Sequence, residues 1–200
     1  MKNTEESVYW NVTWDKRISE TGVSGNQAKF SKIMNFIWQR PQYFKLMKLE
    51  VGCGPGQHAT EVAKYCKEYI KDWMGIDLSH IAISHARKQQ LNAVCDNFLT
   101  WDTPLKFQCF SFWDSLEHFK DPIEVADKVC LLSDKEFMVQ GNIPLYYTKI
   151  KGAGIERPTD INTLTLFWDR LGLRNRGYEV YGVNGYPYLL FEANNFGGAK

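Results

Sequence analysis

The chain has 200 residues, and its 24 Lys and Arg against 23 Asp and Glu give a formal net charge of +1, so no overall electrostatic attraction to nucleic acid or to an anionic membrane is expected. Hydrophobic residues make up 44% and charged residues 24% of the chain, which excludes a disordered protein. No stretch approaches the ~18 apolar residues of a membrane-spanning helix, and five cysteines without a CxxC pair predict a reduced, cytoplasmic protein.

The first half of the chain predicts helices that alternate with short strands. Residues 1–25 are polar with isolated aromatic residues, whereas residues 26–40 carry apolar residues at helical spacing until Pro41. Ser79 is a good N-cap for a later helix. Further helices are expected at residues 57–71 and 79–91, and strands at residues 45–51, 73–77 and 93–95.

The second half of the chain continues this alternation and ends in a hairpin. Asp121 and Pro122 are typical of the first positions of a helix, and Asn184-Gly185 is typical of a two-residue hairpin turn. Strands are expected at residues 107–113, 136–140, 178–183 and 186–192, a helix at residues 160–171, and a long loop at residues 142–158. The predicted fold class is α/β, a doubly wound, Rossmann-like three-layer αβα sandwich whose mostly parallel seven-stranded sheet has an antiparallel C-terminal hairpin strand.

A glycine-rich segment, Leu49-Glu50-Val51-Gly52-Cys53-Gly54-Pro55-Gly56, lies between the first strand and its helix. Glycines there allow a sharp turn and a close approach of the backbone to a ligand. Asp77 ends the next strand, where a carboxylate can accept hydrogen bonds from both ribose hydroxyls of a nucleoside. A dinucleotide fingerprint would need Gly or Ala at position 57, where this chain has Gln57. Glu50 adds a negative charge that favours a cationic ligand.

Three segments in the same order, LEVGCGPG, GIDLS and FWDSLEHFKDP, make residues 45–140 resemble the class I S-adenosylmethionine (SAM)-dependent methyltransferases. The resemblance implies one methyltransferase domain over residues 1–200, with residues 1–40 as a helical lid and residues 142–175 as a substrate-side insertion. It also implies SAM as the cofactor. Gly52, Gly54 and Trp113 would contact its methionine part, and Glu50 would reach the amino group of that part through water. Asp77 would hold the ribose, Leu78, Asp96, Asn97 and Phe98 would contact the adenine, and Cys53 is a further cofactor-binding residue of the loop. An alternative for Asp96 is a loop carboxylate that caps a turn.

The segment from Asp114 to His118 follows the fourth strand, at the edge of the sheet where α/β proteins bind ligands. Its LEH sequence resembles that of the small-molecule branch with the ubiquinone-type O-methyltransferases. His118 is a candidate catalytic base, or else Glu117 and His118 hold the loop in place. Asp114, Glu117 and His118 are potential metal ligands, but no fourth ligand is identifiable, so no metal is predicted.

The substrate of such an enzyme is the least constrained part of the prediction. In the family that the chain resembles, residues 1–40 and 142–175 would form the substrate pocket. The candidates for substrate contacts there are Asn142, Tyr146 and Trp10, although the aromatic residues are also consistent with a core. We expect direct displacement of the methyl group by an O or N atom of a small molecule, without nucleic-acid or membrane partners. The alternatives are a nucleic-acid methyltransferase and a cofactor-binding protein without turnover.

Overall fold

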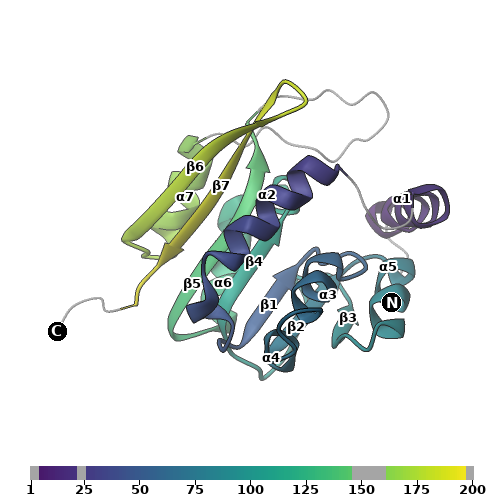
Figure 1. Cartoon of the computed structure of the whole chain (residues 1–200). Helices are drawn as coiled ribbons and strands as arrows, with labels where there is room; N and C mark the ends of the chain where they lie inside the picture. Colours follow the sequence, from purple (N-terminus) through teal and green to yellow (C-terminus); the bar gives the residue numbers. More distant parts are fainter. Residues whose placement is uncertain (1–4, 22–25, 146–160, 197–200) are drawn as a thin grey trace. The chain divides into compact units, whose positions relative to one another are not determined.

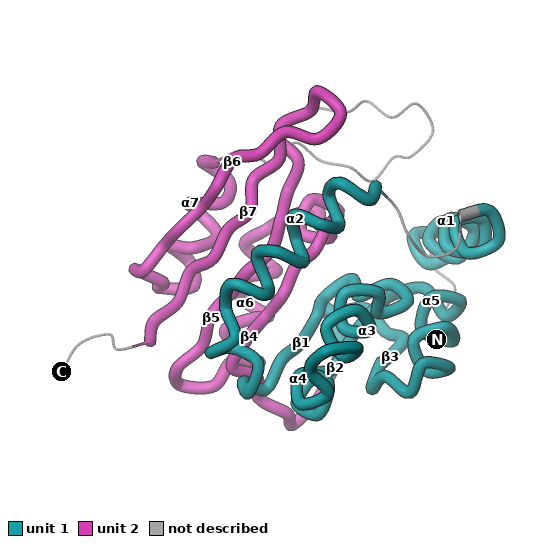
Figure 2. Tube along the Cα trace, viewed as in Figure 1, with its two compact units in different colours: residues 1–102 teal, residues 103–200 magenta. Residues whose placement is uncertain are grey.

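The structure is a computed structural model that describes residues 5–21, 26–145 and 161–196. Helices alternate with strands along most of the chain (Figure 1). The chain divides into two compact units, residues 1–102 and residues 103–200 (Figure 2). Within the described residues, no helix is both long enough and apolar enough to cross a membrane.

The first unit is built on three parallel strands in the order β3-β2-β1. These strands are β1 (Lys48–Val51), β2 (Trp73–Asp77) and β3 (Ala93–Cys95). Every residue of β1 and β2 is buried, as expected for parallel strands that are covered on both faces. The parallel arrangement brings the carboxyl ends of the strands, and the loops that follow them, to one edge.

The helices of the first unit are α1 (Glu5–Thr21), α2 (Gln27–Trp38), the 3-10 helix η1 (Pro41–Tyr43), α3 (Gln57–Ala63), α4 (Glu68–Lys71) and α5 (His80–Lys88). Ser79 caps α5 as predicted, because its Oγ accepts a hydrogen bond from the Ala82 amide at 3.2 Å. The prediction of one helix over residues 57–71 is wrong. The amides of Tyr65 and Tyr69 donate to carbonyls three residues back, and this tighter turn separates α3 from α4 without any change in the spacing of apolar residues.

The second unit contains four strands in the order β4-β5-β7-β6. β4 (Phe107–Trp113) and β5 (Ser133–Pro144) are parallel, whereas β7 (Tyr186–Asn194) is antiparallel to both β5 and β6 (Asn175–Val183). Asn184 and Gly185 have φ values of 52° and 80°, which confirms the predicted hairpin turn. The helices of this unit are the 3-10 helix η2 (Leu116–His118), α6 (Pro122–Leu132) and α7 (Ile161–Arg170).

Strand β5 is longer than the sequence predicts. Residues 142–144 were expected to begin a loop, but they continue β5 and pair with Leu190, Leu189 and Tyr188 of β7. The partner strand lies more than 40 residues away in the sequence, so local turn signals such as Pro144 are overridden by long-range pairing. As a consequence, the buried side chain of Asn142 is held on a strand and not on a mobile connection.

Candidate functional site

The glycine loop after β1 is fixed to the end of β2 by backbone hydrogen bonds. The amides of Gly52 and Cys53 both donate to the Ile76 carbonyl, at 2.8 and 3.1 Å. Gly54 has a φ of 54°, in the left-handed region that favours glycine. The loop therefore has a defined shape that depends on a glycine at position 54.

Asp77 closes this loop from the end of β2. Its Oδ2 accepts a hydrogen bond from the Gly54 amide and its Oδ1 accepts one from the Ser79 amide, each at 2.8 Å. Asp77 is 8% exposed, and this burial raises the pKa of its carboxyl to about 6, although the two amide hydrogen bonds oppose the shift. Because each carboxylate oxygen can accept more than one hydrogen bond, Asp77 can still receive two hydroxyl donors.

Glu50 lies inside the first unit and not at its surface. It is 2% exposed, its Oε1 lies 3.2 Å from His58 Nδ1, and its Oε2 accepts a hydrogen bond from Trp73 Nε1 at 3.0 Å. The ring of His58 in turn stacks on Phe30. Both carboxylate oxygens of Glu50 therefore have a side-chain partner behind the glycine loop, and each oxygen has a further lone pair.

Cys53 is also buried within the loop, with 3% of its surface exposed. Burial raises the pKa of its thiol well above the usual value, and the carboxylates of Asp77 and Glu50 raise that pKa further. The side chain therefore stays a neutral thiol and is not a nucleophile.

Helix α1 covers the glycine loop through Trp14 and Asn11, two contacts that were not predicted from the sequence. A Cβ at Gly54 would lie 2.5 Å from Cζ2 of Trp14, and Ser79 Oγ donates a hydrogen bond to Asn11 Oδ1 at 2.9 Å. Trp14 is 9% exposed although its helix is mostly polar. The only signal for this role was an isolated aromatic residue in a polar segment, which is common at protein surfaces.

Replacing Trp14 by alanine should loosen α1 from the glycine loop. Loss of a buried indole is expected to lower the free energy of unfolding of the docked helix by about 3 kcal/mol, which hydrogen exchange of the α1 amides would measure. Val12, on the same helix, is 65% exposed, so Val12→Ala is the matched control and should change exchange little. Equal exchange in both variants would contradict the docking of α1 by Trp14.

The ends of β2 and β3 bring Leu78 and Asp96 to the same edge as Asp77. The Asp96 amide donates to the Asp77 carbonyl at 3.1 Å, and Leu78 is half-buried. Asp96 Oδ1 also accepts a hydrogen bond from the Asn97 amide at 2.8 Å, so this carboxylate shapes its own turn. Phe98 is buried below this turn with 4% of its surface exposed. Asp77, Leu78 and Asp96 thus lie together at the carboxyl ends of β2 and β3.

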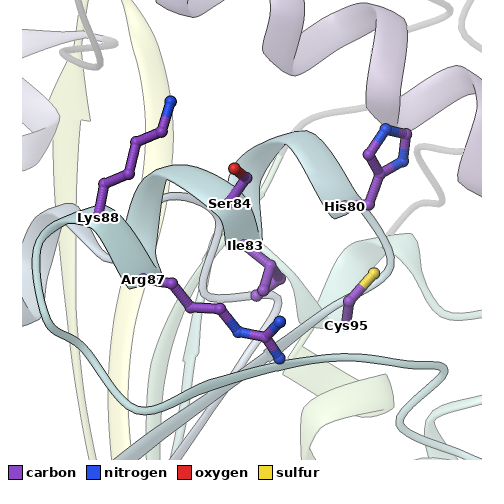
Figure 3. Close-up of a pocket in the computed structure, with 6 residues that line it drawn as sticks. All are labelled: His80, Ile83, Ser84, Arg87, Lys88 and Cys95. Carbon is purple, nitrogen blue, oxygen red and sulfur yellow. The ribbon is translucent and has the colours of Figure 1, made fainter.

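A pocket of about 410 Å³ lies between α5 and β3 (Figure 3). Its lining includes the basic side chains of Arg87 and Lys88 and the Cys95 thiol, and Arg87 Nε donates to the Ala93 carbonyl at 2.9 Å. The pocket is lined by His80, Ile83, Ser84, Arg87, Lys88 and Cys95. None of these residues was predicted to bind a ligand.

In the second unit, a polar cluster follows β4. Asp114 has a φ of 51°, and its backbone amide donates to Asn142 Oδ1 at 2.9 Å while Asn142 Nδ2 donates to Asp114 Oδ1 at 2.6 Å. Asn142 is completely buried, and it pairs with Trp113 in the register of β4 and β5. The two reciprocal hydrogen bonds hold Asp114 in a backbone conformation that is uncommon for a residue with a side chain.

Tyr181 from β6 joins this cluster, although the sequence did not single it out. Its ring stacks on Tyr188, with centroids 5.6 Å apart. Burial raises the pKa of its hydroxyl, and the Asp114 carboxylate raises that pKa further. The side chain therefore remains a neutral phenol next to Asp114.

The remaining predicted residues are placed as follows. Glu117 is buried and His118 half-buried in η2, and Trp10 is half-buried against Tyr9. Tyr146 lies outside the described residues. Among residues 5–21, 26–145 and 161–196, no group of three or more His, Cys, Asp or Glu side chains is arranged to hold a metal ion.

Comparison with known sequences identifies the family. The family described as "methyltransferase domain" matches residues 27–139, which is more than half of the chain. The chain belongs to this methyltransferase family. No curated protein matches the methyltransferase at a significant level.

Solved structures share the fold of the methyltransferase over nearly its whole length. Magnesium protoporphyrin IX methyltransferase (ChlM) from Synechocystis PCC 6803, with bound S-adenosylhomocysteine (SAH), is 15% identical, covers 94% of this chain and 97% of its own, and has a TM-score of 0.70. N-methyltransferase NodS from Bradyrhizobium japonicum WM9, in complex with SAH, is 14% identical, covers 93% and 98%, and has a TM-score of 0.67. The predicted fold class and the predicted class of SAM-dependent methyltransferase are confirmed.

Proposed function

We propose that the methyltransferase transfers a methyl group from SAM to an O or N atom of a small molecule. The observation that carries this proposal is the buried carboxylate of Asp77, which lies at the end of β2 and closes the glycine loop. The net charge of +1 disfavours a polyanionic substrate. Solved structures with the same fold include a porphyrin methyltransferase and an N-methyltransferase, which supports the small-molecule assignment.

The described residues of the first unit fit SAM. Asp77 holds two backbone amides and has lone pairs left for the two ribose hydroxyls, which would stabilise its charged form. Gly52 and Gly54 adopt positive φ values and carry no side chain that would crowd the methionine part. Glu50, whose two oxygens are held by His58 and Trp73, would reach the amino group of the methionine part through water. When bound, SAM supplies a methyl group on a positively charged sulfonium.

The other predicted roles are part of the same proposal. Trp113 contacts the methionine part, Asn142, Tyr146 and Trp10 contact the substrate, and His118 accepts the proton that the acceptor atom loses. Residues 1–40 act as a lid and residues 142–175 as a substrate-side segment of one domain. The LEH sequence supports the small-molecule branch with the ubiquinone-type enzymes, and the five free cysteines support a cytoplasmic setting.

Calorimetry at a series of pH values tests the cofactor site. SAM and SAH should bind and NAD should not, and the affinity for SAH should fall as the pH drops below about 6. The sign follows from Asp77, because burial raises its pKa to about 6 and ribose hydroxyls donate to its charged form, which is lost below that pH. Asp77→Asn should bind SAH at least about tenfold more weakly and lose this pH dependence.

The matched control is Asp72→Asn, since Asp72 is an exposed carboxylate of the same unit. This variant should bind SAH with the affinity and the pH dependence of the unmodified protein. Tight binding of NAD, or a pH dependence that persists in Asp77→Asn, would contradict the proposed cofactor site.

A further inference from the structure

We propose that Asp114, Asn142 and Tyr181 form a binding site for a primary amine, so that the methyl acceptor is a nitrogen atom. This inference rests on the proposed function and adds the class of substrate to it. All three residues belong to the second unit, on the loop after β4, on β5 and on β6.

Asp114 is held in a fixed position by its backbone conformation and by Asn142. Its left-handed backbone (φ 51°) is disfavoured for a residue with a Cβ, and such strain is typical of functional sites. The side chain of the fully buried Asn142 binds both the amide and Oδ1 of Asp114. These two hydrogen bonds fix the direction of the Asp114 carboxylate. Its remaining lone pairs can accept hydrogen bonds from a ligand.

The Tyr181 hydroxyl is buried and can accept a hydrogen bond from a ligand. Tyr181 is 6% exposed, and within the part of the chain that the structure describes its Oη makes no hydrogen bond of normal geometry, although the Asn142 amide lies close enough to lower its pKa. A buried hydroxyl without a hydrogen bond is unfavourable and uncommon. A ligand that donates a hydrogen bond to Oη would remove this penalty.

The carboxylates and aromatic rings around Tyr181 favour an amine over a hydroxyl or an acid. Tyr181 lies within the electrostatic influence of Asp114 and Glu117, two carboxylates that attract a cation and repel a carboxylate or phenolate. Tyr188 stacks on Tyr181, and the two residues stand opposite each other in the β6–β7 hairpin. Their rings add an aromatic surface of the kind that attracts ammonium groups.

The chemistry of the transfer agrees with this arrangement. The carboxylates attract the acceptor as its ammonium, which loses one proton to His118 and becomes a neutral primary amine. This amine can donate one N–H to the Asp114 carboxylate and the other to Tyr181 Oη, which leaves its lone pair for the methyl carbon. The lone pair forms the new N–C bond as the C–S bond breaks, and the electron pair of that bond stays on sulfur. The positive charge that develops on nitrogen is stabilised by Asp114, and the methylated ammonium leaves the site or loses its proton to water.

Binding experiments with paired probes test the amine site without turnover. In the presence of SAH, 2-phenylethylamine and hexylamine should bind, as followed by saturation-transfer NMR and calorimetry, and 2-phenylethanol and hexanol should bind at least tenfold more weakly. Asp114→Asn keeps the size of the side chain and tolerates the left-handed backbone, and it should weaken amine binding at least tenfold. Tyr181→Phe removes only the hydroxyl and should weaken amine binding several-fold.

Control variants distinguish a failure of the amine site from a failure of the proposed methyltransferase function. Tyr178→Phe changes an exposed tyrosine of the same strand, β6, and should leave amine binding unchanged, and all three variants should bind SAH as the unmodified protein does. Equal binding of amines and alcohols, no amine binding at millimolar concentration, or amine binding that survives both Asp114→Asn and Tyr181→Phe would overturn the amine site. Failure of the unmodified protein to bind SAH would instead overturn the proposed function.

Discussion

Gly54→Ala is expected to lower the affinity for SAM and SAH about a hundredfold, or about 2.7 kcal/mol. Gly54 has a φ of 54°, where an L side chain costs about 1–2 kcal/mol. The added methyl group would lie 2.5 Å from the Trp14 ring, so the loop or α1 must move. Because the Gly54 amide donates to Asp77, movement of the loop also displaces the carboxylate that is proposed to hold the ribose.

Two other glycines provide matched controls for this variant, with calorimetry as the measurement. Gly185 also has a positive φ, of 80°, but a Cβ there would meet nothing within 4 Å, so Gly185→Ala should reduce stability and leave SAH affinity unchanged. Gly182 has open space without a positive φ, and Gly182→Ala should change neither quantity. If the Trp14 ring is the obstacle, the double variant Gly54→Ala/Trp14→Leu should recover part of the lost affinity. Normal SAH binding by Gly54→Ala would contradict this account.

The strands that carry the site could be predicted because their signals are local. Strands β2 (Trp73–Asp77) and β4 (Phe107–Trp113) have the bounds that their short apolar runs predict, since strands buried on both faces need continuous apolar residues. The same holds for the glycine loop and Asp77, whose spacing along the chain is fixed by one strand–helix–strand unit. Such features depend on neighbours in the sequence, so a single sequence suffices to find them.

The contacts that complete each cluster could not be predicted, because they join residues far apart in the chain. Trp14 reaches Gly54 across 40 residues, and Tyr181 approaches Asp114 from a strand that begins 61 residues later. His58 and Trp73 bind the two oxygens of Glu50, and neither partner was predicted. The type of a residue does not indicate its long-range partner, because aromatic residues and carboxylates are found both in cores and on surfaces.

His118→Ala is expected to lower kcat about 10²–10⁴-fold, the usual effect of losing a general base, while SAH affinity stays unchanged. His118 ends η2, four residues after Asp114, and is half-buried, so it can be in contact with both acceptor and solvent. In the variant the rate should rise continuously with pH, as more of the amine becomes neutral in solution.

The control is His80→Ala, because His80 is an exposed histidine on α5 and has no proposed part in proton transfer. Steady-state rates with an amine acceptor, SAH calorimetry and thermal unfolding should be compared for both variants. If His118 only holds the loop after β4 in place, His118→Ala should lower the unfolding temperature, and rate and cofactor affinity should fall modestly together. That result would leave the acceptor without a protein base, so the proton would have to pass from the amine directly to water.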